Sequence, residues 1–301
     1  MEICKTPAAI SFSLLYYYAM QQFEEDMKQE HTSFVLTHLP NVDAGLRGGF
    51  TSGVHLLFCI HQRCVSDFTQ QLVEAFAQQK YATVYLTNYV SSFDVYYSLL
   101  SRMLYKRHPH IADSRSLHRV MQENPEVYAD IQKYVEPLAK YISVVQMASL
   151  DTSALREALV RQRKKYNKLV VVFNHSDFSS VHLQDEDMLK KYFEMAVIAN
   201  DLDLPIIIAF LLTVRDCQRL ISGQSDIMEL ILHAKNSMLL QPHEGYKEMN
   251  SNPYFPILLD SPYSTSSSFL MDVWFRPFGE LNFTHKTHLL YYPHHMYFQE
   301  A

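Results

Sequence analysis

Hydrophobic residues along this chain fall into short, nearly unbroken runs that alternate with stretches of helical spacing. The first run is Val54–Ile60, which is interrupted only by His55. After it, apolar residues recur every three to four positions, at Phe68, Leu72, Val73 and Phe76. A short apolar run predicts a buried strand, and the later spacing predicts an amphipathic helix. Residues 48–79 are therefore predicted to form a strand, a turn and a helix.

The same alternation continues to about residue 240 and defines the predicted fold. Further strands are predicted at Tyr81–Leu86, Ile142–Gln146, Leu169–Phe173, Leu204–Leu212 and Ser237–Leu240. Helices are predicted at Phe93–Tyr105, Pro125–Tyr141, Asp151–Lys165, Asp187–Asn200 and Asp226–Ala234, and a hairpin at Phe269–Phe275 and Glu280–Phe283. Such alternation favours right-handed crossovers and parallel strands. We predict an α/β fold with three αβα layers, a mostly parallel central sheet and a C-terminal antiparallel edge.

Composition places the chain among globular proteins. It has 301 residues, of which 48% are hydrophobic and 19% are charged. The net charge of −6 argues against broad nucleic-acid binding, although local basic patches are compatible with it. The four cysteines form no CxxC pair and Cys59 lies in a predicted buried strand, so we expect a reducing, cytoplasmic location. The apolar segment Ala8–Met20 is too short to span a bilayer, and we expect no membrane contact.

The turn after the first strand is where a nucleotide-binding α/β protein places its phosphate-binding loop. Here the turn is His61–Asp67, which contains neither glycine nor lysine. Four of the seven glycines lie within residues 45–53, and none lies from Val54 to Ser222. Backbone cradles for phosphate need glycine so that the main chain can approach the anion. The sequence therefore predicts the scaffold of a nucleotide site without its chemistry.

The order of these elements resembles the RecA-like motor domain of the DnaB-type replicative helicases. The segments in which the two are similar are Phe34–Gly53, Ser149–Phe178, Leu189–Arg215 and Ser222–Gly223. The resemblance implies a RecA-like P-loop ATPase domain over residues 34–283. Residues 1–33 are then predicted to add an N-terminal helix that packs on the core, and residues 284–301 are predicted to form a tail.

The positions that are functional in that family hold different residues here. The phosphate-loop motif G-x-x-x-x-G-K-T falls on Ile60–Asp67, so the resemblance marks His61, Arg63, Val65, Ser66 and Asp67 as degenerate phosphate-loop positions. The Walker B aspartate falls on Asn174, the water-activating acid near Asn88-Tyr89, the sensing glutamine on Leu211 and the Lys-x-Arg finger on 260–262. Phosphoryl transfer depends on positioned charge. The resemblance thus implies a lost ATPase activity and no cofactor.

Two further groups of polar residues offer other chemistry. His285, His288, His294 and His295 are metal-ligand types, but no acidic or cysteine residue stands at a usual spacing from them, so we predict no metal site. His175, Ser176 and Asp177 follow a predicted strand at the end where open α/β sheets bind ligands. Neighbours along a loop seldom face one another, so we interpret this group as a polar cap of the strand.

One dense basic cluster stands out in this acidic chain, formed by Arg156, Arg161, Arg163, Lys164, Lys165 and Lys168. It is compatible with a solvated helix face and with a contact to a phosphate backbone. We favour a catalytically inactive binding or scaffold component of DNA replication, repair or a mobile element, which associates with itself or with a protein partner. The alternatives are a nucleic-acid-binding module that uses the basic cluster, and an enzyme of another class with its site near Thr87, His175 and Thr213.

Overall fold

The computed structural model describes most of the chain after residue 33. The described residues are 34–87, 90–108, 120, 122–147, 150–175, 186–223, 228–243, 268–280 and 282–301. The predicted N-terminal helix, Asn88-Tyr89, Ser176, Asp177 and residues 260–262 lie outside these ranges. Among the described helices, none is both long enough and apolar enough to cross a membrane.

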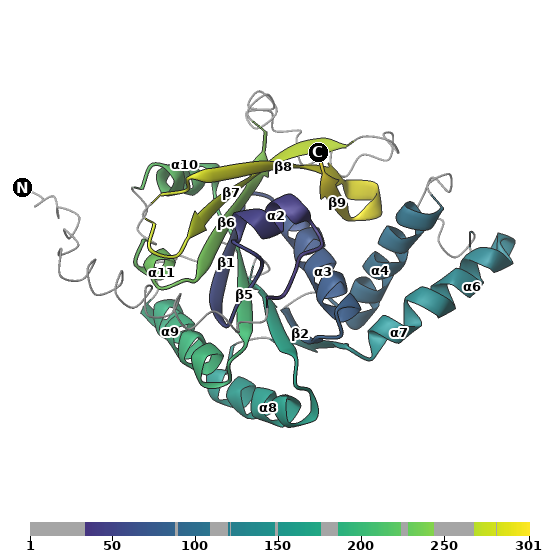
Figure 1. Ribbon diagram of the computed structural model, residues 1–301, viewed down its shortest axis with the longest axis horizontal. Coiled ribbons are helices and arrows are strands. Elements are labelled where there is room, and N and C mark those ends of the chain that lie inside the picture. The colour runs from purple at the N-terminus through teal and green to yellow at the C-terminus, as the bar shows by residue number, and fades with distance from the viewer. Residues whose placement is uncertain are drawn as a thin grey trace, which may run out of the picture.

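A sheet of nine strands forms the centre of the molecule (Figure 1). Its order is β3-β2-β4-β5-β1-β6-β7-β8-β9. The strands are β1 (Gly53–Cys59), β2 (Ala82–Thr87), β3 (Ile142–Gln146), β4 (Leu169–Asn174), β5 (Pro205–Leu211), β6 (Asn236–Pro242), β7 (Phe269–Pro277), β8 (His285–Tyr292) and β9 (Tyr297–Glu300). The pairs among β1 to β6 are parallel, and β7, β8 and β9 add an antiparallel edge. The predicted fold class is confirmed, with β1, β2, β4 and β5 as parallel central strands.

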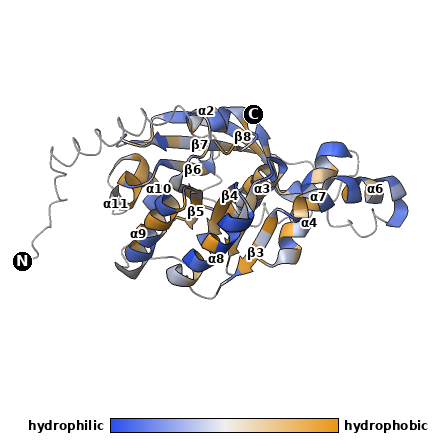
Figure 2. Cartoon of the chain, turned by 60° about the horizontal axis from the view of Figure 1, so that its bottom comes forward, coloured by the Kyte–Doolittle hydropathy of each residue, from blue (hydrophilic) through white to orange (hydrophobic). Residues whose placement is uncertain are grey.

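Helices cover both faces of this sheet (Figure 1). They are α2 (Pro40–Gly45), α3 (Gln62–Gln78), α4 (Ser92–Arg107), α6 (Pro125–Tyr134), α7 (Glu136–Ala139), α8 (Thr152–Lys165), α9 (Glu186–Asp201), α10 (Val214–Ile221) and α11 (Met228–Leu232), with the short 3₁₀ helix η5 (Pro293–His295). Successive strand residues point to opposite faces, so each strand contributes to two cores. On β4, Val172 packs in the core under α3, whereas Val171 packs in the core under α8 to α11. Figure 2 shows hydrophobic residues on the central strands and hydrophilic residues on α8.

Local sequence signals account for several helix boundaries. Ser91 and Asp94 form a capping box at the start of α4. The Asp151 side chain caps α8 by accepting a hydrogen bond from the backbone N–H of Ala154 at 3.0 Å. The helix predicted to run unbroken from Pro125 to Tyr141 is instead divided into α6 and α7. Pro137 explains the division, because a proline inside a helix removes a hydrogen bond and clashes with the preceding turn.

Two expectations about the ends of elements are corrected by the structure. The second strand of the hairpin, predicted at Glu280–Phe283, begins instead at His285 as β8. The segment 284–301, expected to be a tail, forms β8, η5 and β9 of the same sheet. Its alternate apolar residues explain this, because Leu289, Tyr291 and Phe298 are buried in the core under α3.

Candidate functional site

The connection between β1 and α3 is short and leads directly into the helix. Strand β1 ends at Cys59 and α3 begins at Gln62, so Ile60 and His61 alone separate them. The backbone N–H of Val65 already bonds to the carbonyl of His61 at 3.1 Å. The turn predicted at His61–Asp67 is thus mostly the first part of a helix, because no glycine or proline interrupts it. In this described stretch, the backbone forms no open loop that could surround a phosphate.

Asp67 is bonded to the C-terminal strands. Its side chain is buried, and the hydroxyl of Tyr291 on β8 donates to Asp67 Oδ2 at 2.5 Å. Arg63 Nε lies 3.8 Å from the same oxygen. Burial, together with the nearby Asp67 carboxylate, raises the pKa of Tyr291 well above its ordinary value. The phenol therefore stays protonated and remains a donor to Asp67.

Ser66 and Asn174 meet beside the start of α3, where the resemblance placed their family counterparts. The side-chain amide of Asn174 donates to Ser66 Oγ at 3.4 Å and to the hydroxyl of Tyr85 at 3.2 Å. Gln70 also donates to Ser66 Oγ, at 3.2 Å. Asn174 itself is fully buried. The structure brings these groups together, but their polar atoms bond to one another and Asn174 carries no charge.

The strand-end residues considered for another enzyme class have structural contacts. His175 is buried and packs its ring against Phe173 and Phe210, with ring centroids 5.2 and 5.4 Å away. Thr87 accepts a hydrogen bond from the backbone of Val90 at 3.1 Å. Thr213 caps α10. Each of these contacts holds the backbone or fills the core, which agrees with the interpretation of His175 as part of a cap.

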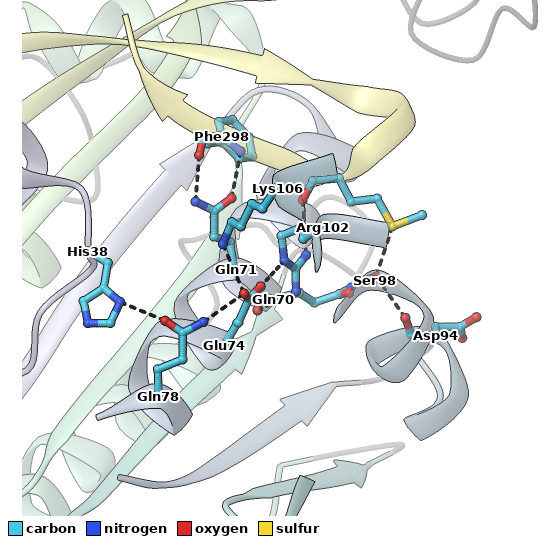
Figure 3. Close-up of polar contacts among 11 residues, drawn as sticks. His38, Gln70, Gln71, Glu74, Gln78, Asp94, Ser98, Arg102, Lys106 and Phe298 are labelled. Carbon is cyan, nitrogen blue, oxygen red and sulfur yellow. Dashed lines mark hydrogen bonds and ion pairs between the residues drawn. The ribbon is translucent and has the colours of Figure 1, made fainter. Parts of the chain in front are cut away.

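The polar side of α3 forms a buried network with α4 and the C-terminal strand (Figure 3). Glu74 Oε2 accepts from Arg102 Nε at 2.6 Å, and Glu74 Oε1 lies 3.1 Å from Lys106 Nζ. Burial alone would raise the pKa of the Glu74 carboxyl, but the Arg102 and Lys106 charges outweigh it and hold this pKa below its ordinary value. Gln71 bonds to both backbone groups of Phe298, at 2.7 and 2.8 Å. The C-terminal strand is thereby attached to α3 through side chains.

Solved structures resemble this arrangement over nearly the whole chain, although no protein-family profile and no curated protein sequence matches it. The ATPase domain of G40P has a TM-score of 0.67 at 11% identity, covering 98% of this chain and 100% of that one. A DnaB-like replicative helicase, described with its interactions with primase, also has a TM-score of 0.67, at 10% identity, over 99% of this chain and 68% of that one. The RadB recombinase has a TM-score of 0.52 at 11% identity, over 89% of this chain and 100% of that one.

The fold is that of a RecA-like ATPase domain. At these identities the likeness establishes the fold and not an activity. Within the RecA-like domain, sequence reasoning missed Tyr291 as the partner of Asp67, and Arg102 as the partner of Glu74. The first pair is separated by 224 residues, so no local pattern links its members. The sequence gives a weak indication of the second pair, because Glu74 lies next to the apolar residues of a predicted amphipathic helix and so close to the core.

The basic cluster of the RecA-like domain lies on and just after α8. Arg156 pairs with Asp201 at 2.7 Å, and Arg163 donates to the backbone carbonyl of Asn167. Arg161, Lys164 and Lys165 are exposed. Glu157 lies 3.9 Å from Arg161 and reduces the local positive charge. Lys168 follows the helix and is exposed, with its ammonium 5.1 Å from the ring of Tyr81. The cluster therefore offers three exposed charges near the end of one helix.

Proposed function

We propose that this chain is a catalytically inactive RecA-like domain that acts as a binding or scaffold component in DNA replication, repair or a mobile element. The observation that supports it most is that three of the phosphate-loop positions are buried or bonded within the protein. Val65 is buried, Ser66 accepts from Asn174 and Gln70, and Asp67 accepts from Tyr291. A bound triphosphate would have to displace these bonds and would meet a carboxylate, which repels it.

Loss of nucleotide binding can be measured directly. Calorimetric titration of the full chain with ATP and Mg²⁺ is expected to give no micromolar binding, and phosphate release is expected to stay at the level of buffer. Losing one positioned charge commonly costs several kcal/mol in a phosphoryl-transfer enzyme, so the combined loss leaves no measurable turnover. Micromolar ATP affinity that disappears in an Arg63→Gln variant would contradict the proposal.

The scaffold part of the proposal concerns a protein partner. One structural neighbour is described with its interactions with primase, which supports a search for partners among replication proteins. Affinity purification from the native host, followed by reconstitution with the purified candidate, tests this part. Light scattering over a range of concentrations tests self-association. A chain that stays monomeric and reconstitutes with none of its co-purifying proteins would refute it.

Nucleic-acid binding through α8 is the second candidate, supported by the exposure of Arg161, Lys164 and Lys165. If three phosphates are neutralised on duplex DNA, the log–log salt slope should be about −2.7, and affinity should fall about forty-fold from 50 to 200 mM salt. Replacing all three residues by glutamine should flatten that slope in a fluorescence anisotropy titration. The control is Arg156→Gln, because Arg156 already pairs with Asp201. Absence of binding by the parent at 50 mM salt would exclude this function.

A further inference from the structure

Three metal-ligand side chains converge in the antiparallel part of the sheet. Asp272 lies on β7, and His288 stands opposite it on β8 in the strand register. His243 follows the last residue of β6, and its backbone N–H bonds to Leu270 on β7. The carboxylate of Asp272 is fully buried, whereas the side chains of His243 and His288 are 33% and 42% exposed. The group is thus anchored in the sheet and open to solvent on its histidine side.

The donor atoms are close enough to share one ion. Nδ1 of His243 lies 2.7 Å from Asp272 Oδ1, and Nδ1 of His288 lies 2.9 Å from the same oxygen. Ligand atoms from all three residues lie within 4.8 Å of one another. Zinc bonds to nitrogen and oxygen are about 2.0–2.2 Å long, so tetrahedral ligands are about 3.3 Å apart. The two nitrogen–oxygen distances of 2.7 and 2.9 Å are about half an ångström shorter than this spacing and would lengthen by that amount when an ion binds.

We propose that His243, Asp272 and His288 form a Zn²⁺ site whose coordination is completed by water. Two imidazoles and one carboxylate are a ligand set that Zn²⁺ accepts, and a site with three protein ligands keeps a position open. The half-exposed histidines provide access for that water. No short sequence motif indicates this site, because Asp272 is 16 residues from His288 and 29 residues from His243 along the chain.

The same geometry separates the two histidines whose spacing was considered from the sequence. His285 and His288 are three residues apart on β8, so their side chains leave opposite faces of the sheet and cannot share an ion. Asp272 on the neighbouring strand β7 is the acidic partner that His288 lacks at a usual spacing in the sequence. His285 is exposed and belongs to the same strand, which makes it the matched control for His288.

Lys286 lowers the affinity that we expect this site to have for Zn²⁺. Its ammonium forms an ion pair with Asp272 Oδ2 at 2.9 Å, but the two groups are not aligned for a hydrogen bond. This buried oxygen therefore has no aligned hydrogen-bond donor. The ion pair holds the carboxylate with Oδ1 toward the histidines, as an outer partner of a metal ligand does. The charge of Lys286 also repels a cation. Without metal, Oδ1 instead accepts hydrogen bonds from the two imidazoles, so metal and protons compete for the same atoms.

The test is a Zn²⁺ titration of the full chain in competition with a chromogenic chelator. The parent should bind one Zn²⁺ per chain in the micromolar range or tighter. His243→Gln and His288→Gln should each weaken binding at least about tenfold. His285→Gln should leave it unchanged, and Lys286→Gln should tighten it about fivefold because one repelling charge is removed. Circular dichroism checks that each variant is folded.

A second measurement needs no variant. X-ray absorption of the Zn²⁺-loaded parent should show two imidazole ligands, and Co²⁺ substituted for Zn²⁺ should give visible absorption typical of low coordination number. The proposal is overturned by absence of stoichiometric binding, by fewer than two imidazoles in the spectrum, or by a His285→Gln variant that binds as weakly as His288→Gln.

Discussion

Glu74 and Arg102 form a buried ion pair between α3 and α4. The side chains are 7% and 0% exposed, and the guanidinium also donates to the backbone carbonyls of Gln70 and Met296, each at 3.1 Å. Glu74→Gln keeps the shape of the side chain and removes its charge, which leaves the Arg102 guanidinium buried without its counterion. Breaking a buried pair in this way costs about 3–5 kcal/mol. We expect the free energy of unfolding to fall by that amount.

Urea unfolding near neutral pH, followed by circular dichroism, measures this loss. The control is Arg47→Met, which removes a pair of similar length, 2.8 Å to Glu280, whose side chains are 57% and 29% exposed. Exposed pairs contribute about 0–1 kcal/mol. The Arg102→Met single variant and the Glu74→Gln, Arg102→Met double variant complete a cycle that isolates the coupling between the two residues. A Glu74→Gln loss no larger than the Arg47→Met loss would refute the argument that burial decides the strength of this pair.

Three further predictions concern the same helix. Because the pKa of Glu74 is lowered in the folded protein, its stabilising contribution is present above the unfolded value of about 4.5 and is lost as pH falls. Glu74→Gln should therefore remove part of the acid dependence of urea unfolding as the pH falls from above 4.5 to below it. Tyr291→Phe should cost about 1–3 kcal/mol in the same assay, since Asp67 loses its buried donor; an unchanged midpoint would contradict this. Placing glycine, lysine and threonine at Val65, Ser66 and Asp67 should yield no ATP hydrolysis in a phosphate-release assay and should lower the melting temperature.

The arrangement of the sheet could be predicted because its strands differ in composition from everything around them. Leu169–Phe173 is apolar at every position, which is typical of a strand covered on both faces, and β4 is such a strand. The C-terminal region was harder to interpret. In β8 the buried positions are Leu289 and Tyr291, but the preceding His285, Lys286 and His288 give the segment the composition of a loop. Their partners lie on β7, which the sequence does not place beside them.

The contacts of the candidate site could not be predicted, for a different reason. The resemblance assigns Asp67 to the degenerate phosphate loop and Asn174 to the degenerate Walker B position, and that assignment does not say which groups they contact instead. The answer depends on residues brought close by folding, such as Tyr291 from β8. Buried polar groups must find partners. Which partner is present is a property of the tertiary structure and leaves no trace in local spacing.

The obstacle to nucleotide binding in this domain lies in the backbone as well as in the side chains. A phosphate-binding loop works because its N–H groups are left without intrahelical partners and point at the anion. Here α3 begins at Gln62, directly after the short connection, and the N–H of Val65 is already bonded to His61. New side chains at Ser66 and Asp67 would still stand on a helix whose N–H groups form intrahelical bonds from Val65 onward. A restored site would need the first turn of α3 to unwind, and replacing Asp67 would also remove the acceptor of the hydrogen bond from Tyr291 on β8.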